Sequence, residues 1–147
     1  MHSLNIPHWD VKPDNVHYTE DNVLKLAGPL LPCTSYEKSD LSSVYFTCNV
    51  GTPAYMAPEI FKNLIPSKDG KKYDVMPYDA IKADCWSFGV FVYELCTFHH
   101  PFRFKDFDEY MEKIPNKKLK VPNVNINPKI SEATTKMLKD IYVGLLS

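Results

Sequence analysis

The sequence predicts a mainly α-helical α+β domain, and three observations carry this prediction. An apolar run at 82–96 predicts one long buried helix, and residues 16–27, with a polar turn in the middle, predict a short β-hairpin. The length of 147 residues suits one domain, 1–147, that can bury a core. The hydrophobic content of 44% and the charged content of 24% are ordinary for a globular protein.

The apolar run reads KADCWSFGVFVYELC, and we expect the rest of the chain to pack around it as a central helix over 81–96. Its apolar side chains leave no wide polar face, so we expect cover on nearly all sides. With Asp84 and Glu94 inside it, the run is too short and too charged for a membrane span.

Asp84 needs an explanation, because a buried carboxylate requires hydrogen-bond donors. In one interpretation Asp84 lies in the first helical turn and caps the N-terminus, where the helix dipole favours an anion. In the other interpretation Asp84 holds the backbone of a second, functional loop. The N-terminal part of the chain offers such a loop.

Composition and charge exclude several classes of function. The formal charge of −1 implies no general attraction to nucleic acid or to anionic membranes, so we expect neither as a partner. We find no signal-peptide pattern, and none of the five histidines has a partner at zinc-ligand spacing. The four cysteines lack paired spacing, which favours reduced thiols in an intracellular, cytoplasmic or nuclear setting. They are Cys33, Cys48, Cys85 and Cys96.

The candidate functional loop reads HWDVKPDN at 8–15, after a segment at 1–7 that looks like the last turn of a helix. Asp10, Lys12 and Asn15 bring an acceptor, a cation and an amide oxygen close together in it. Phosphoryl transfer uses such a set, because a carboxylate accepts the hydroxyl proton, a lysine offsets phosphate charge and an amide oxygen ligates Mg²⁺.

The loop resembles the catalytic loop of eukaryotic protein kinases, whose pattern is H-R-D-L-x-x-x-N. Three further stretches follow in the family's order: GTPAYMAPE at 51–59, KADCWSFGVFVYEL at 82–95 and HPF at 100–102. They resemble the end of an activation segment, the central helix of the family and the turn after it. The resemblance covers essentially the whole chain, but only the family's C-terminal lobe, and Lys12 with Gly51-Thr52 is typical of the serine/threonine branch.

The resemblance implies ATP-dependent phosphoryl transfer to a Ser or Thr hydroxyl of a protein, with Mg²⁺ as the metal. It also implies an activation segment over 28–59 and a protein as substrate or partner. The roles it implies are Asp10 as catalytic base, Lys12 as phosphate contact, Asn15 as magnesium ligand, Thr52 as the partner of Asp10, and His8, Glu59 and Asp84 as structural anchors.

The sequence departs from the family where its D-F-G motif belongs. After LKLA at 24–27 the chain reads Gly28-Pro29-Leu30, so the main magnesium-binding Asp is absent. Glycine offers no side-chain oxygen for a hard cation. The site is then either decayed or compensated by other residues, and we favour the first interpretation.

Two further departures concern arginine. Trp9 stands where most of these kinases have the arginine that pairs with a phosphorylated activation loop, and a neutral indole cannot do this. We therefore do not expect regulation by such pairing. No arginine follows Arg103 to pair with Glu59, so we expect a weakened contact there.

The rest of the chain adds a loop and two helices. Residues 66–80 predict a loop longer than the family usually carries, and Asp106 with Glu109 at capping-box spacing predicts a helix. A last helix is predicted to begin at Ser131.

The family's N-terminal lobe has no counterpart in this sequence. All five glycines are isolated, so no G-x-G-x-x-G loop is present to cover ATP. We therefore expect a kinase fragment that is inactive or impaired as an isolated chain. An inactive pseudokinase that binds a partner protein is the alternative, and a compensated, magnesium-independent enzyme is the third possibility.

Overall fold

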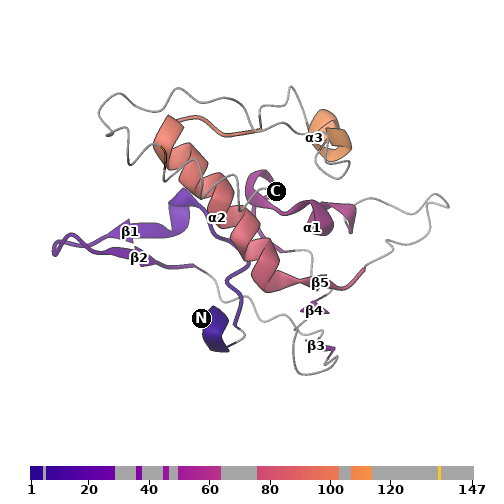
Figure 1. The fold of residues 1–147 in the computed structure, drawn as a ribbon, viewed down its shortest axis with the longest axis horizontal. Helices are drawn as coiled ribbons and strands as arrows, with labels where there is room; N and C mark the ends of the chain where they lie inside the picture. Colours follow the sequence, from indigo (N-terminus) through magenta and orange to yellow (C-terminus); the bar gives the residue numbers. More distant parts are fainter. Residues whose placement is uncertain are drawn as a thin grey trace.

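The structure is a computed structural model that describes residues 1–4, 6–28, 36–37, 45–46, 50–63, 76–102, 107–113 and 136 (Figure 1). Three 3-10 turns, three helices and five short strands make up this part of the chain. The turns are His2–Leu4, Pro13–Asn15 and Pro53–Tyr55; the helices are α1 (Pro58–Lys62), α2 (Ala80–Thr97) and α3 (Phe107–Lys113); the strands are β1 (Val16–Tyr18), β2 (Leu24–Leu26), β3 (Tyr36–Glu37), β4 (Tyr45–Phe46) and β5 (Tyr78–Asp79).

The predicted hairpin is confirmed as the antiparallel pair β1–β2, in which Val16 lies opposite Leu26. Asn22 adopts a left-handed conformation with φ of 60° in its turn, a conformation that asparagine tolerates better than most residues. In Figure 1 the hairpin extends from one side of α2, whereas α1 lies on the other side. The hairpin therefore carries the chain away from the loop at 8–15 and back to it.

A second sheet joins the predicted activation segment to the central helix. Its strand order is β3-β4-β5, and Phe46 of β4 lies opposite Tyr78 of β5 in antiparallel register. The sequence predicts only a loop over 66–80, and β5 together with the first residue of α2 corrects the last part of that prediction. Because β5 runs directly into α2, backbone pairing ties β4 to the beginning of that helix.

Helix α2 begins one residue before the predicted range of 81–96, and its cap differs from our first interpretation. Asp79 is the N-cap, and its Oδ1 accepts hydrogen bonds from the backbone N–H groups of Ile81 and Lys82 at 3.1 and 3.2 Å. Asp84 lies a turn further along, so the interpretation of Asp84 as the capping acid is wrong. The helix ends at Thr97, and the next residue, Phe98, has a left-handed φ of 56° that turns the chain out of the helical path.

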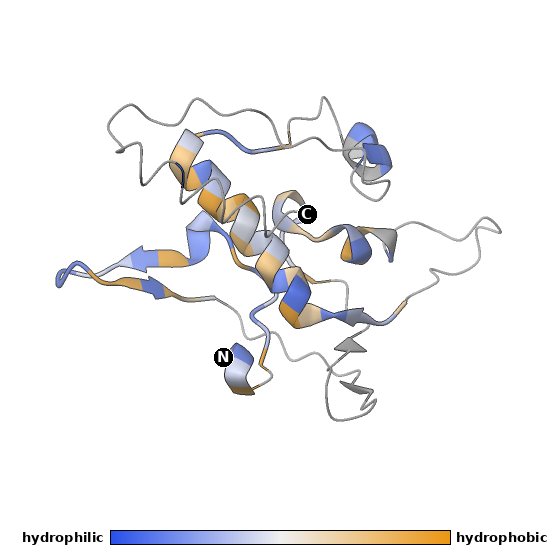
Figure 2. Cartoon of the chain, in the orientation of Figure 1, coloured by the Kyte–Doolittle hydropathy of each residue, from blue (hydrophilic) through white to orange (hydrophobic). Residues whose placement is uncertain are grey.

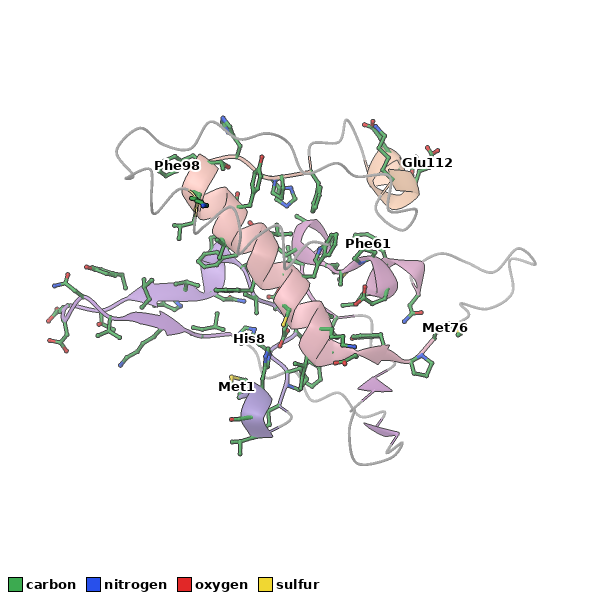
Figure 3. The ribbon with its side chains drawn as sticks, viewed as in Figure 1. Met1, His8, Phe61, Met76, Phe98 and Glu112 are labelled. Atoms are coloured by element: carbon green, nitrogen blue, oxygen red, sulfur yellow. The ribbon has the colours of Figure 1, made fainter. Side chains whose placement is uncertain are left out.

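The hydrophobic core lies where α1 and β5 meet α2. Trp9, Tyr55 and Trp86 pack around its edge, and Trp86 stacks on Phe102 with ring centroids 5.6 Å apart. The buried members are Met56, Ala57, Ile60, Phe61, Tyr78, Ala80, Ala83, Val90 and Phe102. Phe61, labelled in Figure 3, has no exposed surface, so the short helix α1 contributes one of the best-buried side chains.

The expectation that α2 is covered on nearly all sides is wrong for one face. Phe88 and Leu95 are 45% and 56% exposed, and they lie seven positions apart on the same side of the helix. The ring of Phe88 contacts that of Phe91 on this face. Figure 2 shows α2 with hydrophobic residues distributed along its length. An apolar surface on α2 thus faces outward.

Helix α3 confirms the helix predicted after Asp106, although Asp106 itself lies outside the described residues. Most of the helix predicted from Ser131, the residues 29–35, 38–44 and 47–49 of the predicted activation segment, and with them Cys33 and Cys48, also lie outside the described residues. In the part of the chain that is described, no helix combines the length and the apolar character needed to cross a membrane. The thiols of Cys85 and Cys96 are free.

Phe61→Ala tests the position of the core. The free energy of unfolding should fall by about 3–5 kcal/mol, because the change removes a buried ring and leaves a cavity. Phe88→Ala is the matched control on the exposed face of α2 and should change it by about 0.5 kcal/mol or less. Urea unfolding of both variants measures the difference, and equal losses would contradict the described packing.

Candidate active site

Asp84 of α2 lies at the base of the predicted catalytic loop and is 3% exposed. Its Oδ2 accepts a hydrogen bond from the backbone N–H of His8 at 2.6 Å, and its Oδ1 accepts one from the N–H of Trp9 at 2.8 Å. The ring Nε2 of His2 lies 2.8 Å from Oδ2. Figure 3 shows His8 beside α2. A carboxylate in the helix thus holds the backbone of a loop that lies 75 positions or more from it in sequence.

The loop backbone is unusual at Trp9, whose φ of 65° is left-handed, a conformation that costs a non-glycine residue about 1–2 kcal/mol. Gly51 lies against it with φ of 114°. A Cβ atom added to Gly51 would lie 2.6 Å from the carbonyl oxygen of Trp9, so only glycine fits there. The close approach of these two backbones brings Thr52 to the loop.

Asp10, Lys12 and Thr52 form a closed cluster of polar side chains. The Thr52 hydroxyl donates to Asp10 Oδ1 at 2.7 Å, although the two residues are 42 positions apart. Lys12 Nζ lies 3.0 Å from Asp10 Oδ2 and 2.6 Å from Thr52 Oγ1. The structure thus brings together three residues that the kinase resemblance groups in one site.

Asn15 completes the loop from the side of the hairpin. Its side-chain N–H group donates to the Asp10 carbonyl oxygen at 2.6 Å and to Asp10 Oδ2 at 3.1 Å. The backbone carbonyl oxygen of Asn15 accepts a hydrogen bond from the backbone N–H of Ala27 at 2.7 Å. Asn15 therefore fixes Asp10 and holds the end of β2 against the loop.

The pKa of Asp10 is lower than its usual value of 3.8. Partial burial by itself raises this pKa, but hydrogen bonds from Thr52, Lys12 and Asn15 and the positive charge of Lys12 outweigh burial. Asp10 is consequently ionised at neutral pH, and its carboxylate can accept a proton.

His8 and Gly28 lie on the other side of the loop. The N–H of Asp10 donates to His8 Nδ1 at 3.3 Å, so His8 Nε2 carries the hydrogen that points to the Ala27 carbonyl oxygen at 3.3 Å. Gly28 has φ of 144°, and a Cβ atom there would lie 3.0 Å from both the His8 ring and the Asn15 amide nitrogen. A residue with a side chain would be strained and crowded at position 28.

The residues described at this site do not fit a complete magnesium centre. Mg²⁺ prefers carboxylate and other oxygen ligands in a near-octahedral arrangement. The amide nitrogen of Asn15 is turned to Asp10, so its amide oxygen is the atom that could bind Mg²⁺. Gly28 supplies no side-chain oxygen as a further ligand. Among the described residues, no group of three or more His, Cys, Asp or Glu side chains is placed to hold a metal ion.

Glu59 lies apart from this cluster, in the first turn of α1. Its side chain is partly exposed, and among the described residues it forms no ion pair. The one arginine of the chain, Arg103, lies outside those residues. Partial exposure and the helix dipole both reduce the cost of an unpaired carboxylate at this position.

Sequence reasoning missed three groups that support the site. The Tyr55 hydroxyl donates to Glu94 of α2, and burial together with this carboxylate raises the pKa of Tyr55. His100 Nε2 lies 2.8 Å from the Ala54 carbonyl oxygen, and His2 contacts Asp84. No residue spacing signals these pairs, which are 39, 46 and 82 positions apart.

Comparison with known proteins decides the family. Residues 1–146 match the family described as the protein kinase domain. The chain belongs to the protein kinase family. The match confirms the prediction of a protein kinase family member, and members of this family typically use ATP and Mg²⁺.

Several curated protein kinases are similar to this kinase-family chain. It is 32% identical to CBL-interacting serine/threonine-protein kinase 15 of Arabidopsis thaliana, with 96% of the chain and 33% of the relative covered. It is 36% identical to G2-specific protein kinase nim-1 of Neurospora crassa over 79% of the chain and 11% of the relative. It is 32% identical to serine/threonine-protein kinase Nek4 of Mus musculus over 81% and 13%. The chain spans about a third or less of the length of these relatives.

Replacing Asp84 tests the hold of α2 on the loop. Asp84→Ala should lower the free energy of unfolding by about 3 kcal/mol, because it leaves two loop N–H groups without their acceptor. Asp84→Asn should cost less, since the amide oxygen still accepts one bond. Urea unfolding with amide exchange at His8 and Trp9 measures both effects. Asp21→Ala in the exposed hairpin turn removes the same charge and should leave both readouts near wild type.

Thr52→Ala tests the electrostatics of the cluster. The pKa of Asp10 should rise, because the change removes a hydrogen bond that favours the carboxylate. Thr52→Ser keeps the hydroxyl and should keep the low pKa. Because the folded-state pKa lies below 3.8, the contribution of Asp10 to stability is present above that pH and is lost as the pH falls through the folded value. Carboxyl ¹³C titration by NMR gives the pKa, and an unchanged titration in Thr52→Ala would contradict the described contact.

Proposed function

We propose that this chain is the C-terminal lobe of a serine/threonine protein kinase, with a catalytic loop at 8–15, an activation segment at 28–59 and a central helix at 81–96. In the complete protein the reaction is transfer of the ATP γ-phosphate to a Ser or Thr hydroxyl of a protein substrate. The observation that carries this proposal is the closed cluster of Asp10, Lys12 and Thr52.

The cluster assigns a part of the reaction to each residue. Asp10, ionised at neutral pH, accepts the proton of the substrate hydroxyl. Lys12 lies 3.0 Å from the carboxylate that would face the substrate hydroxyl. From there its positive charge offsets the negative charge of the phosphate that is transferred to that hydroxyl. Thr52 holds Asp10 in place through its hydroxyl. These are positioning and proton-accepting roles, and no step of them is routed through a metal ion.

The same geometry favours weak or absent activity of the isolated chain. The magnesium ligands are incomplete, and the side chains of His8 and Asn15 crowd any side chain at position 28 that would restore them. The sequence also holds no Gly-rich loop to cover ATP. We propose that nucleotide binding requires groups that these residues do not supply.

An inactive pseudokinase that binds a partner protein is the alternative, and the exposed face of α2 favours it. Phe88 and Leu95 on this face and Phe98 at the helix end are all exposed, and so are Leu24 and Leu26 of the hairpin. Exposed apolar surface of this kind marks a place where protein contacts form. The free thiols of Cys85 and Cys96 agree with an intracellular setting for either function.

ATP binding by the purified 147-residue chain, with and without Mg²⁺, is the deciding test. A ligand that binds only the folded state raises its melting temperature. We expect a cooperative melt that about 1 mM ATP does not shift, a concentration at the upper end of ordinary enzyme KM values. The domain of a complete, active protein kinase serves as the positive control.

A Mg²⁺-dependent shift would overturn the proposed loss of nucleotide binding. Phosphate transfer to a Ser/Thr peptide would then be measured, and its loss in Asp10→Asn would assign the activity to this loop. Asp21→Asn, an exposed carboxylate in the hairpin turn, is the matched control.

A further inference from the structure

His100 lies in the turn after α2 and reaches back to the segment that carries Thr52. Its Nε2 lies 2.8 Å from the carbonyl oxygen of Ala54. Ala54 is the middle residue of the Pro53–Tyr55 turn, which begins directly after Thr52. A side chain 46 positions away therefore contacts the turn next to the catalytic cluster.

The second ring nitrogen of His100, Nδ1, contacts the backbone of Phe102. Nδ1 lies 3.2 Å from the N–H nitrogen and 3.0 Å from the carbonyl oxygen of Phe102. A carbonyl oxygen only accepts, so the contact with Ala54 requires the hydrogen on Nε2. In the neutral ring with that tautomer, Nδ1 accepts from the N–H of Phe102. Both ring nitrogens then have a partner.

Aromatic contacts hold the ring in this orientation. His100 meets the ring of Tyr55 edge-on with centroids 5.6 Å apart, and it meets that of Phe102 edge-on at 5.9 Å. Tyr55 is itself held by α2, because its hydroxyl donates to Glu94 and its carbonyl oxygen accepts from the Ser87 hydroxyl at 2.7 Å. The Pro53–Tyr55 turn is therefore attached to α2 and to the turn that follows it.

We propose that His100 is a positioning residue that fixes the Pro53–Tyr55 turn and so sets the place of Thr52 beside Asp10. Thr52 is joined to this turn by a hydrogen bond, since the Thr52 carbonyl oxygen accepts from the N–H of Tyr55 at 2.9 Å. The importance of this placement for catalysis rests on the proposed function. The geometric role stands on the described contacts alone.

Three substitutions separate the contacts of His100. His100→Gln places an amide group near the position of Nε2, so it can still donate to Ala54. His100→Asn places its polar atoms near the position of Nδ1 and does not reach Ala54. His100→Ala removes both contacts. His99→Ala is the control, because the neighbouring His99 side chain is exposed.

Two measurements on the full chain test the proposal without any need for activity. The first is amide exchange at Tyr55 and Met56, whose N–H groups close the turn. It should accelerate roughly tenfold in His100→Ala and His100→Asn, and remain near wild type in His100→Gln and His99→Ala. Exchange at His8 and Trp9 should stay unchanged, since Asp84 holds those amides.

The second measurement is the carboxyl ¹³C titration of Asp10. If Thr52 moves when His100 is lost, the pKa of Asp10 rises in His100→Ala and His100→Asn but not in His100→Gln. A purely structural role would accelerate exchange at all amides equally and leave this titration unchanged, which would overturn the proposal. Equal exchange rates and equal Asp10 titrations in His100→Gln and His100→Asn would also overturn the proposal. This comparison tests the proposal even if His100→Ala does not fold.

The test is independent of the proposed function. Absence of an ATP shift in the wild type agrees with the proposed loss of nucleotide binding and leaves the contacts of His100 as they are. Wild-type exchange and titration in His100→Ala would remove the positioning role, whatever the chain does with ATP.

Discussion

Hydrogen bonds to the buried carboxylate of Asp84 connect the central helix α2 to the loop at 8–15, and the arrangement of the polar site follows from them. A charge at this depth is costly unless donors surround it, and two backbone N–H groups and a histidine ring provide them. The two N–H groups belong to the loop at 8–15, so that loop stays in place as long as the carboxylate keeps these hydrogen bonds. The hydrophobic helix α2 thereby becomes the rigid reference for a polar site.

Helix α2 and the turn after it also position the Pro53–Tyr55 turn, which follows Thr52. Ser87 and Glu94 hold Tyr55, and the turn after the helix brings His100 to Ala54. The backbone at Gly51 then passes so close to Trp9 that no side chain fits between them. Asp10 and Thr52 meet because both of their segments are fastened to one helix, and this fastening offsets the strain of the left-handed Trp9.

The polar cluster and the possible metal ligands differ in how complete they are. The cluster of Asp10, Lys12 and Thr52 is closed, and although burial raises the pKa of Asp10, its hydrogen bonds and the charge of Lys12 lower it further. The set of oxygen ligands suited to Mg²⁺ is incomplete among the described residues, because Gly28 has no side-chain oxygen and the His8 and Asn15 side chains leave little room for one. Exposed apolar residues on α2 and the hairpin add surface suited to protein contacts.

The central helix and the hairpin at 16–27 could be predicted from the sequence, because local periodicity and turn residues indicate both. The resemblance to protein kinases predicted that Asp10 and Thr52 are partners and placed Lys12 in the same site. The cap of α2 could not be predicted in this way, because Asp79 and Asp84 both stand close to the helix start and the fold makes Asp79 the N-cap. The exposure of Phe88 and the contact of His100 with Ala54 likewise follow from the path of the chain in three dimensions. A local pattern fixes which face a residue occupies, but the path of the chain decides what meets that face.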